Sequence, residues 1–224
     1  MEFNISTLKN KINFLHVPYS PSARYGDPAG TLTGIFSALE PNQVVYEPWP
    51  GAGRKPEVEF KMFYGDDAVF LKFTVKEKHF KATYKQINDP VWNDSCVEFF
   101  IGFKENEPYY NFEFNAAGTP LVGYGIDKKR ELADPSLVSS IKCIAVNNET
   151  ADDLLPFNWE LTVAIPFTLF YKHNVTTLAG AYCIGNFYKC GDDLPEPHFL
   201  CWNNILADKP NFHLPQYFGQ LIFE

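Results

Sequence analysis

Residues 96–103 read CVEFFIGF and residues 109–115 read YYNFEFN, two aromatic-rich runs separated by a short polar stretch. Aromatic and β-branched residues favour strands because they pack well on a pleated surface. In the second run polar and aromatic residues alternate, which puts Asn111, Glu113 and Asn115 on one face of a strand. These two runs predict neighbouring antiparallel strands joined by a polar turn.

Further strand patterns flank this pair on both sides. Residues 58–64 and 68–76 are largely apolar and meet at a Gly-Asp-Asp turn, which is the pattern of a β-hairpin. Similar runs are found at 121–126, 138–146, 158–165, 182–190, 199–202 and 219–223. We find no apolar period of 3.6 residues, apart from one short helical turn expected at 167–173 after a proline. About ten short strands predict an all-β fold, an antiparallel two-sheet β-sandwich that is either immunoglobulin-like or jelly-roll-like.

The size and composition of the chain suit one folded domain. Of the 224 residues 46% are hydrophobic and 21% charged, which excludes a disordered chain, and 17% are aromatic, which suits sheets. We expect a single domain over residues 1–224. Seven prolines between residues 18 and 56 exclude a long helix there, although a short strand at 43–47 remains open. Residues 1–30 are expected to form an irregular N-terminal segment.

The chain is acidic, with 27 Asp and Glu residues against 19 Lys and Arg residues and a net charge of −8. Its longest basic run, at 128–130, is too short for a nucleic-acid partner or an anionic membrane surface. No stretch approaches the ~18 apolar residues of a membrane span, and no secretion signal is visible. Five cysteines, an odd number, suit free thiols. We expect no nucleic acid and no membrane as partners, and a cytoplasmic location, or a secreted or periplasmic one if a signal has been removed.

Patterns typical of nucleophiles and cofactor sites are not found in the sequence. There is no Gly-x-Ser-x-Gly motif, no Cys-x-x-Cys or His-x-x-x-His spacing, and no glycine-rich nucleotide loop before a helix. We therefore expect no required cofactor and no catalytic residue of these kinds.

Carboxylates are stronger candidates for a site. Glu98 lies inside an otherwise apolar run and needs a partner or a cleft. If the two central strands are neighbours, Glu98 and Glu113 can line one groove together with Asn111 and Asn115. A glycosidase uses two carboxylates about 5 to 10 Å apart, so a glycoside hydrolase that uses Glu98 and Glu113 is the alternative function. A solvated sheet face with one ion-paired glutamate explains the same pattern without a site.

Two aromatic residues lie in loops rich in polar residues and proline. Trp92 is followed by Asn93 and Asp94, and Phe212 lies in a loop that begins at Pro210. Such rings either cap the ends of the core or stack on the apolar face of a sugar whose hydroxyls bind amides and carboxylates. The residues themselves leave both interpretations open.

Residues 90–100 (PVWNDSCVEFF) resemble the Trp-x-x-Asp-Ser-Val-Glu-aliphatic-Phe segment of family 9 carbohydrate-binding modules. These modules are known from xylanases, and their wider group is the DOMON-like superfamily. The Trp-to-Glu spacing is kept, whereas Asp94 stands one place earlier and Cys96 takes the place of Ser. Residues 111–115 resemble the next family strand, and residues 211–221 (NFHLPQYFGQL) resemble the closing segment of the family.

Two further runs, GNFYKCGD at 185–192 and FLCWN at 199–203, look like a subgroup of bacterial, nearly single-domain proteins. The resemblance extends from about residue 30 to the end of the chain. In the family two rings sandwich a terminal sugar, and these positions fall on Trp92 and Phe212. The family's sugar-binding Glu and Asn fall on Glu98 and Asn115. The resemblance thus implies eight candidate carbohydrate-binding residues: Trp92, Glu98, Glu113, Asn115, Asn186, Lys189, Trp202 and Phe212.

The sequence departs from the family at Glu113, where the family has Arg, so the ligand need not be the usual one. The family also has structural calcium, for which the aspartate pairs at 66–67, 152–153 and 192–193 could supply oxygen ligands. The superfamily includes haem binders, but only Met1 and Met62 are present for a Met/His axial pair.

We therefore predict non-catalytic binding of a mono- or oligosaccharide, gripped between two rings, in the use of xylan-like polysaccharides and thus in carbohydrate catabolism. No cofactor is expected to be required, and calcium remains possible as a structural ion. The alternatives are the glycoside hydrolase described above and a haem-binding or interaction module.

Overall fold

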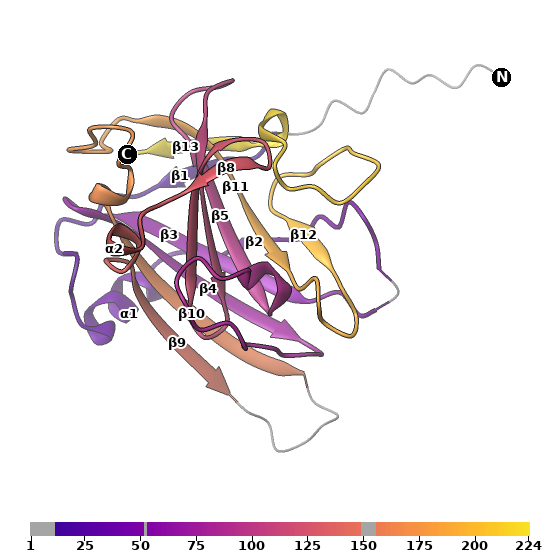
Figure 1. Ribbon diagram of the computed structural model, residues 1–224. Coiled ribbons are helices and arrows are strands. Elements are labelled where there is room, and N and C mark those ends of the chain that lie inside the picture. Colours follow the sequence, from indigo (N-terminus) through magenta and orange to yellow (C-terminus); the bar gives the residue numbers. More distant parts are fainter. Residues whose placement is uncertain (1–11, 52, 149–155) are drawn as a thin grey trace.

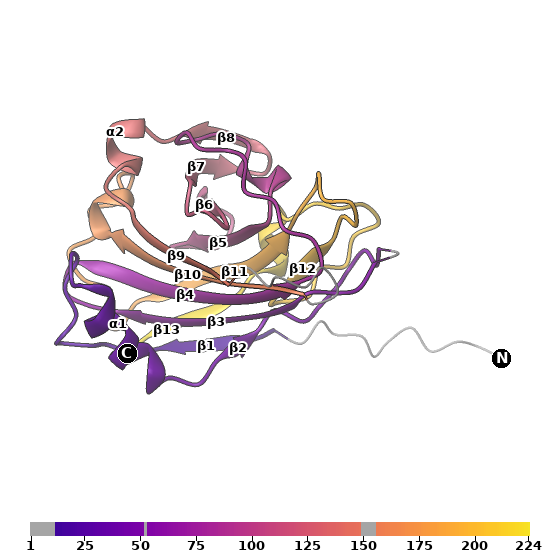
Figure 2. The same cartoon turned by 90° about the horizontal axis from the view of Figure 1, so that it is seen from below.

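The computed structural model describes residues 12–51, 53–148 and 156–224, which form two β-sheets packed face to face (Figures 1 and 2). The larger sheet has the order β1 (Phe14–Val17), β13 (Gly219–Phe223), β11 (Tyr182–Cys190), β5 (Cys96–Gly102), β6 (Tyr109–Asn115), β7 (Pro120–Ile126) and β8 (Lys129–Leu132), with β12 (Phe199–Cys201) paired to β11. The smaller sheet has the order β2 (Asn42–Gln43), β3 (Glu57–Tyr64), β4 (Ala68–Glu77), β10 (Phe157–Pro166) and β9 (Lys142–Asn148). The helices are α1 (Ala29–Ser37) and α2 (Pro135–Val138), with 3₁₀ turns η1 (Val91–Asn93), η2 (Phe167–Leu169) and η3 (Pro215–Tyr217).

The predicted two-sheet sandwich is confirmed. β5 and β6 pair in antiparallel register, which places Glu98 opposite Glu113. β3 and β4 form the predicted hairpin, and the helical turn expected after Pro166 is η2. The other predicted runs after residue 120 also form strands, except that the run at 138–146 begins with the end of α2 and continues as β9.

The structure differs from the sequence-based expectation in three places. β1 lies within the segment 1–30 and pairs parallel with β13, so the larger sheet is not wholly antiparallel. α1 forms between two prolines, where Leu32 and Phe36 pack on Phe63. β8 is a polar edge strand that owes its place to pairing with β7. Each of these elements is short, so its formation depends more on contacts with neighbouring elements than on its own residues.

Aromatic rings fill the space between the two sheets. Phe60 of the smaller sheet stacks on Phe187 of the larger sheet, with ring centroids 3.6 Å apart, and Phe187 stacks on Phe99. Trp202 is buried beside them and meets Phe60 and Phe187 edge-on. This row of rings joins the sheets through apolar burial and edge-to-face contacts.

The outer face of the larger sheet is covered as well. Phe100 and Tyr188 point away from the sandwich core and are buried under the loops that carry Phe212 and Phe218. Every residue of β5 and β6 is therefore buried. The interpretation of the face around Glu113 as a solvated surface is wrong, because a second layer of loops lies over it.

Within the described residues, none of the helices combines the length and the apolar character that crossing a membrane requires. The longest of them, α1, has nine residues.

Candidate functional site

A cavity of about 570 Å³ lies in the outer cover of the larger sheet. Glu98 of β5, Glu113 of β6, Trp92 of η1, Arg130 of β8 and residues 210–213 line it. The volume is within the range of small-molecule sites. Four of the eight predicted site residues line this cavity: Trp92, Glu98, Glu113 and Phe212.

The two glutamates have different partners although they face each other across the β5–β6 ladder. Glu113 Oε1 lies 2.9 Å from the Arg130 guanidinium and accepts a hydrogen bond of 2.8 Å from the Asn111 side chain. Glu98 Oε1 accepts a hydrogen bond of 3.1 Å from the Cys190 thiol. Among the described residues, Glu98 has no cation within 4.0 Å. The carboxyl pair is therefore asymmetric.

Both glutamates bind a proton more strongly than free glutamates do. Burial, followed by the Glu113 charge, raises the pKa of Glu98 well above its ordinary value. Burial raises the pKa of Glu113 to about 7, although the Arg130 charge acts in the opposite direction. Because two neighbouring carboxylates in a dry site resist carrying two charges, Glu113 ionises first and Glu98 keeps its proton to higher pH.

Arg130 is a residue of the cavity that the sequence analysis missed. It lies opposite Gly125 of β7, and its side chain crosses that strand beside Gly123. A Cβ atom at Gly123 would lie only 2.7 Å from the Arg130 Cδ atom. The guanidinium carbon lies 5.6 Å from the centre of the Trp92 ring, within the range of a cation–π contact. The alternating glycines of β7 are the sequence signal that could have revealed this crossing.

His213 holds the Arg130 guanidinium from another side. Its Nε2 atom accepts a hydrogen bond of 2.6 Å from Arg130, so its Nδ1–H donates to the Tyr109 hydroxyl at 3.0 Å. Burial and the Arg130 charge lower the pKa of His213 to about 3, so the ring is neutral at neutral pH. A carboxylate, an imidazole and an indole together fix the position of Arg130.

The two rings predicted to grip a sugar both line the cavity, but they differ in how much of each ring is open. Trp92 is half-buried. Phe212 is 8% exposed, and one face of its ring stacks on Tyr188 with centroids 4.2 Å apart. Phe199 and Trp49 lie beside Phe212 as well. Trp92 therefore offers more open ring surface than Phe212 does.

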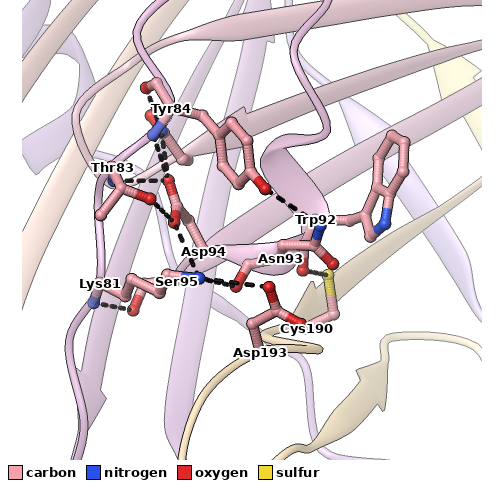
Figure 3. A network of polar contacts seen from close by, with 10 residues as sticks. Lys81, Thr83, Tyr84, Trp92, Asn93, Asp94, Ser95, Cys190 and Asp193 are labelled. Carbon is pink, nitrogen blue, oxygen red and sulfur yellow. Dashed lines mark hydrogen bonds and ion pairs between the residues drawn. The ribbon is translucent and has the colours of Figure 1, made fainter.

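The loop that carries Trp92 is held by the buried carboxylate of Asp94 (Figure 3). Asp94 accepts four hydrogen bonds of 2.8 to 3.0 Å, from the N–H and hydroxyl of Thr83, the N–H of Tyr84 and the side chain of Asn115. The Trp92 indole points away from this network in Figure 3. The network thus fixes the loop without using the ring.

The sequence model of carbohydrate-binding family 9 matches residues 36–223. The chain belongs to this family. A crystal structure of a candidate carbohydrate-binding protein from Bacteroides uniformis ATCC 8492 is 33% identical, with a TM-score of 0.85, over 96% of this chain and 100% of that chain. Two structures of a family 9 module from Caldicellulosiruptor kristjanssonii, in complex with cellotriose and with glucose, share the fold at 12% and 13% identity. Their TM-scores are 0.61 and 0.59; both matches cover 95% of this chain, and 94% and 96% of those chains. A comparison with curated proteins finds no match.

Membership of family 9 decides between the two main functions that the sequence left open. This family 9 chain is a non-catalytic carbohydrate-binding module, and the hydrolase alternative based on Glu98 and Glu113 is not supported. Arg130 brings a guanidinium to Glu113 from β8.

Two predicted site residues on the outer face of the family 9 module hold loops and do not line the cavity. Asn115 donates hydrogen bonds to the Tyr84 carbonyl at 2.8 Å and to Asp94 at 3.0 Å. Asn186 donates to the Asn203 carbonyl at 2.9 Å and accepts from the Asn203 N–H at 2.8 Å. The amide groups of both residues are used within the protein, which orders the cover over the sheet.

Lys189 and Trp202 point into the sandwich. Lys189 follows Tyr188, whose ring is on the outer face, so the alternation along β11 turns Lys189 to the core side. Its ammonium group lies 2.9 Å from Glu77 Oε2 and donates a hydrogen bond of 2.9 Å to His198 Nε2. Trp202 is the core residue described above. Neither side chain lines the cavity.

One cluster of metal-binding atoms occurs among the described residues, formed by Cys96, Glu98 and Cys190 within 4.8 Å of one another. Burial raises the pKa of the Cys96 thiol to about 11, and the hydrogen bond with Cys96 together with burial raises the pKa of Cys190 well above its ordinary value. A metal ion binds thiolates, whereas these thiols hold their protons strongly. The structure therefore favours Cys190 as a hydrogen-bond donor to Glu98.

Two of the three aspartate pairs considered for calcium lie in the described residues, and one aspartate of each forms an ion pair within the protein. Asp66 pairs with Arg24 at 2.9 Å, and Asp193 pairs with Lys81 at 3.3 Å. Asp192 lines the cavity, and the pair 152–153 lies outside the described residues. Calcium takes about six to eight oxygen ligands. Calcium binding stays a prediction from the resemblance.

Proposed function

We propose that the cavity binds the terminal sugar of an oligosaccharide, with Trp92 as the stacking surface and Glu98, Glu113 and Arg130 as the polar contacts. The proposal rests on one observation: an open indole, two carboxyls and a guanidinium line the same cavity. Sugars need this combination, because their ring faces are apolar and their rims carry hydroxyls.

The polar groups of the cavity can both donate hydrogen bonds to a sugar hydroxyl and accept hydrogen bonds from it. The Arg130 guanidinium only donates, and an ionised Glu113 only accepts. A protonated Glu98 donates through one oxygen and accepts through the other. Hydrogen bonds to charged groups are roughly twice as strong as neutral ones, so Arg130 and Glu113 would fix the orientation of the sugar. The Phe212 ring would add a smaller apolar area to the lining of the cavity.

The candidate ligands are β-linked glucose or xylose oligosaccharides. Structures of a family 9 module from another organism hold cellotriose and glucose. The resemblance to xylanase-associated modules adds xylan-like glycans. Glucose and xylose rings both present a flat apolar face of the kind that stacks on an indole.

Calorimetric titration with glucose, cellotriose and xylotriose tests the proposal on wild type and Trp92→Ala. Loss of the stacking surface should weaken binding by roughly 1 to 3 kcal/mol, about ten- to hundredfold in Kd. Tyr182→Ala removes a ring that is 72% exposed and lies outside the cavity, so it should leave Kd unchanged.

Thermal melting of the same variants separates a binding role from a core-capping role. We expect Trp92→Ala to lose affinity with little change in Tm, because its ring is only half-buried. Retained affinity in Trp92→Ala would contradict the stacking role, and absence of binding to all three sugars in wild type would contradict the choice of ligand.

A further inference from the structure

Three carboxyl groups line the cavity, but only two cationic side chains do. The carboxyls belong to Glu98, Glu113 and Asp192, and the cations belong to Arg130 and Lys128. The balance of charge inside the cavity therefore depends on which carboxyl has no cation.

One of the two cations is already paired with a carboxyl. Arg130 lies 2.9 Å from Glu113. His213 also contacts Arg130, but its lowered pKa of about 3 means that it adds no charge at neutral pH. Asp192 forms no ion pair within 4.0 Å among the described residues, but its side chain is exposed and keeps its water. Glu98 is therefore the buried carboxyl of the three that has no cation beside it.

Glu98 is a buried carboxyl that faces the cavity without a cation. It is 4% exposed, and among the described residues its nearest polar partner is the Cys190 thiol at 3.1 Å. Its other ionisable neighbours are Cys96 on its own strand and Glu113 on the next, neither of which supplies positive charge. Arg130 lowers the Glu98 pKa only as a more distant charge, after burial and the Glu113 charge have raised it.

A ligand that fills the cavity removes the remaining water from Glu98. With a neutral sugar the carboxyl must keep its proton or become a buried, unpaired charge, which is unfavourable. A ligand with a positive charge at this point lets Glu98 ionise and form a charge-assisted hydrogen bond. Three carboxylates would then face three cations.

We propose that the preferred ligand of this cavity is an amino sugar whose ammonium group pairs with Glu98; this inference rests on the proposed sugar site. Glu113 lies 2.9 Å from Arg130 and, when it is ionised, offsets the Arg130 charge that would oppose such a ligand. The ammonium group would occupy the side of the cavity formed by β5 and β11, where Glu98 and Cys190 meet.

Calorimetric titration of wild type with glucosamine, glucose and N-acetylglucosamine at near-neutral pH tests the inference. Glucosamine and glucose differ only in the substituent at one carbon, and N-acetylglucosamine carries an uncharged group there. We expect glucosamine to bind about tenfold or more tightly than either neutral sugar, since one charged hydrogen bond supplies that much. Equal affinity for glucose and glucosamine would overturn the amino-sugar inference and leave the sugar site standing. If none of the sugars binds, the proposed function fails with it.

The variant Glu98→Gln tests whether the preference for glucosamine depends on Glu98. The ratio of glucose Kd to glucosamine Kd should fall from about ten to about one, because the amide has no charge to offer. Glu105→Gln removes an equal charge from an exposed turn between β5 and β6 and should keep the wild-type ratio. If the ratio of glucose Kd to glucosamine Kd stays at about ten in Glu98→Gln, the ammonium group pairs with another carboxyl and the assignment to Glu98 is wrong. The comparison of ligands on wild type stands even if Glu98→Gln folds poorly.

Discussion

Glu98 and Glu113 share one rung of the β5–β6 ladder, and both are buried there. A fold selected for stability alone would place apolar residues at these two positions, since a buried carboxyl loses its hydration. The Arg130 guanidinium and the Cys190 thiol compensate one oxygen of each glutamate. The remaining capacity for hydrogen bonds is directed to the cavity, which is where a ligand can use it.

The first prediction follows from the protonation of this pair. Because the pKa of each glutamate is higher in the folded protein than in an unfolded chain, the folded state binds the extra protons. The pair therefore destabilises the fold progressively as pH rises from about 4.5 through the pKa values of the folded state. We expect Glu98→Gln to gain stability relative to wild type as pH rises from acidic to neutral, measured as the free energy of unfolding in urea.

Other groups also titrate in that range, so the difference between variant and wild type is the informative quantity. His198 and His213, with pKa values lowered to about 3, change the stability of both proteins alike. Glu105→Gln makes the same substitution at an exposed turn position and serves as the matched control. If the free energy of unfolding of Glu98→Gln, relative to wild type, stays constant or falls as pH rises, the raised pKa of Glu98 is contradicted.

At the scale of elements, the β7–β8 hairpin decides whether the cavity has a cation. The second prediction is that Gly123→Ala displaces Arg130, since the new Cβ atom would lie 2.7 Å from Arg130 Cδ and 2.6 Å from Asn111 Oδ1. We expect a loss of stability of roughly 1 to 3 kcal/mol from overpacking, together with weaker sugar binding. Urea unfolding and calorimetric titration measure the two effects.

The matched control for this change is Gly34→Ala on α1, where a Cβ atom would meet nothing within 4 Å. Alanine there should add up to about 1 kcal/mol of stability through helix propensity and leave binding unchanged. Unchanged affinity in Gly123→Ala would show that Arg130 is not needed at its observed position.

The strands also show why some site residues can be predicted from the sequence and others cannot. Alternation along β6 correctly places Glu113 on the face opposite the sandwich core, and the strand pairing with β5 then brings Glu98 beside it. Alternation cannot tell which part of that face is covered, so Asn115, on the same face, holds a loop instead of lining the cavity. Arg130 comes from a polar edge strand, whose position follows only from its pairing with β7.

At the scale of the whole molecule, the strand pattern predicts the sandwich because most strands carry aromatic or β-branched residues that face a core. The cover over the outer face could not be predicted in the same way. It is built from irregular loops held by particular polar contacts, such as the four hydrogen bonds to Asp94. The burial of Lys189 inside the sandwich could not be predicted either, because it depends on an ion pair with Glu77, which is distant in sequence.

The third prediction concerns calcium. One aspartate of each described pair contacts a protein cation, Asp66 at Arg24 and Asp193 at Lys81, so part of its charge is already offset. We expect a chelator to leave Tm within about 2 °C, which corresponds to less than about 1 kcal/mol for a chain of this size. A larger fall in Tm that added calcium reverses would show that a structural calcium site exists.

The parallel pairing of β1 with β13 has a consequence for how the chain folds. β13 lies between β1 and β11, so the first and last described strands become neighbours only across nearly the whole length of the chain. Contacts of such long sequence separation form late and slow the overall rate, because the intervening loop must be closed first. Until residues 219–223 have been synthesised, the edge of β11 from Tyr182 to Gly185 is unpaired, and an unpaired edge is a site of aggregation. During synthesis, the larger sheet therefore depends on its last strand for protection from other chains.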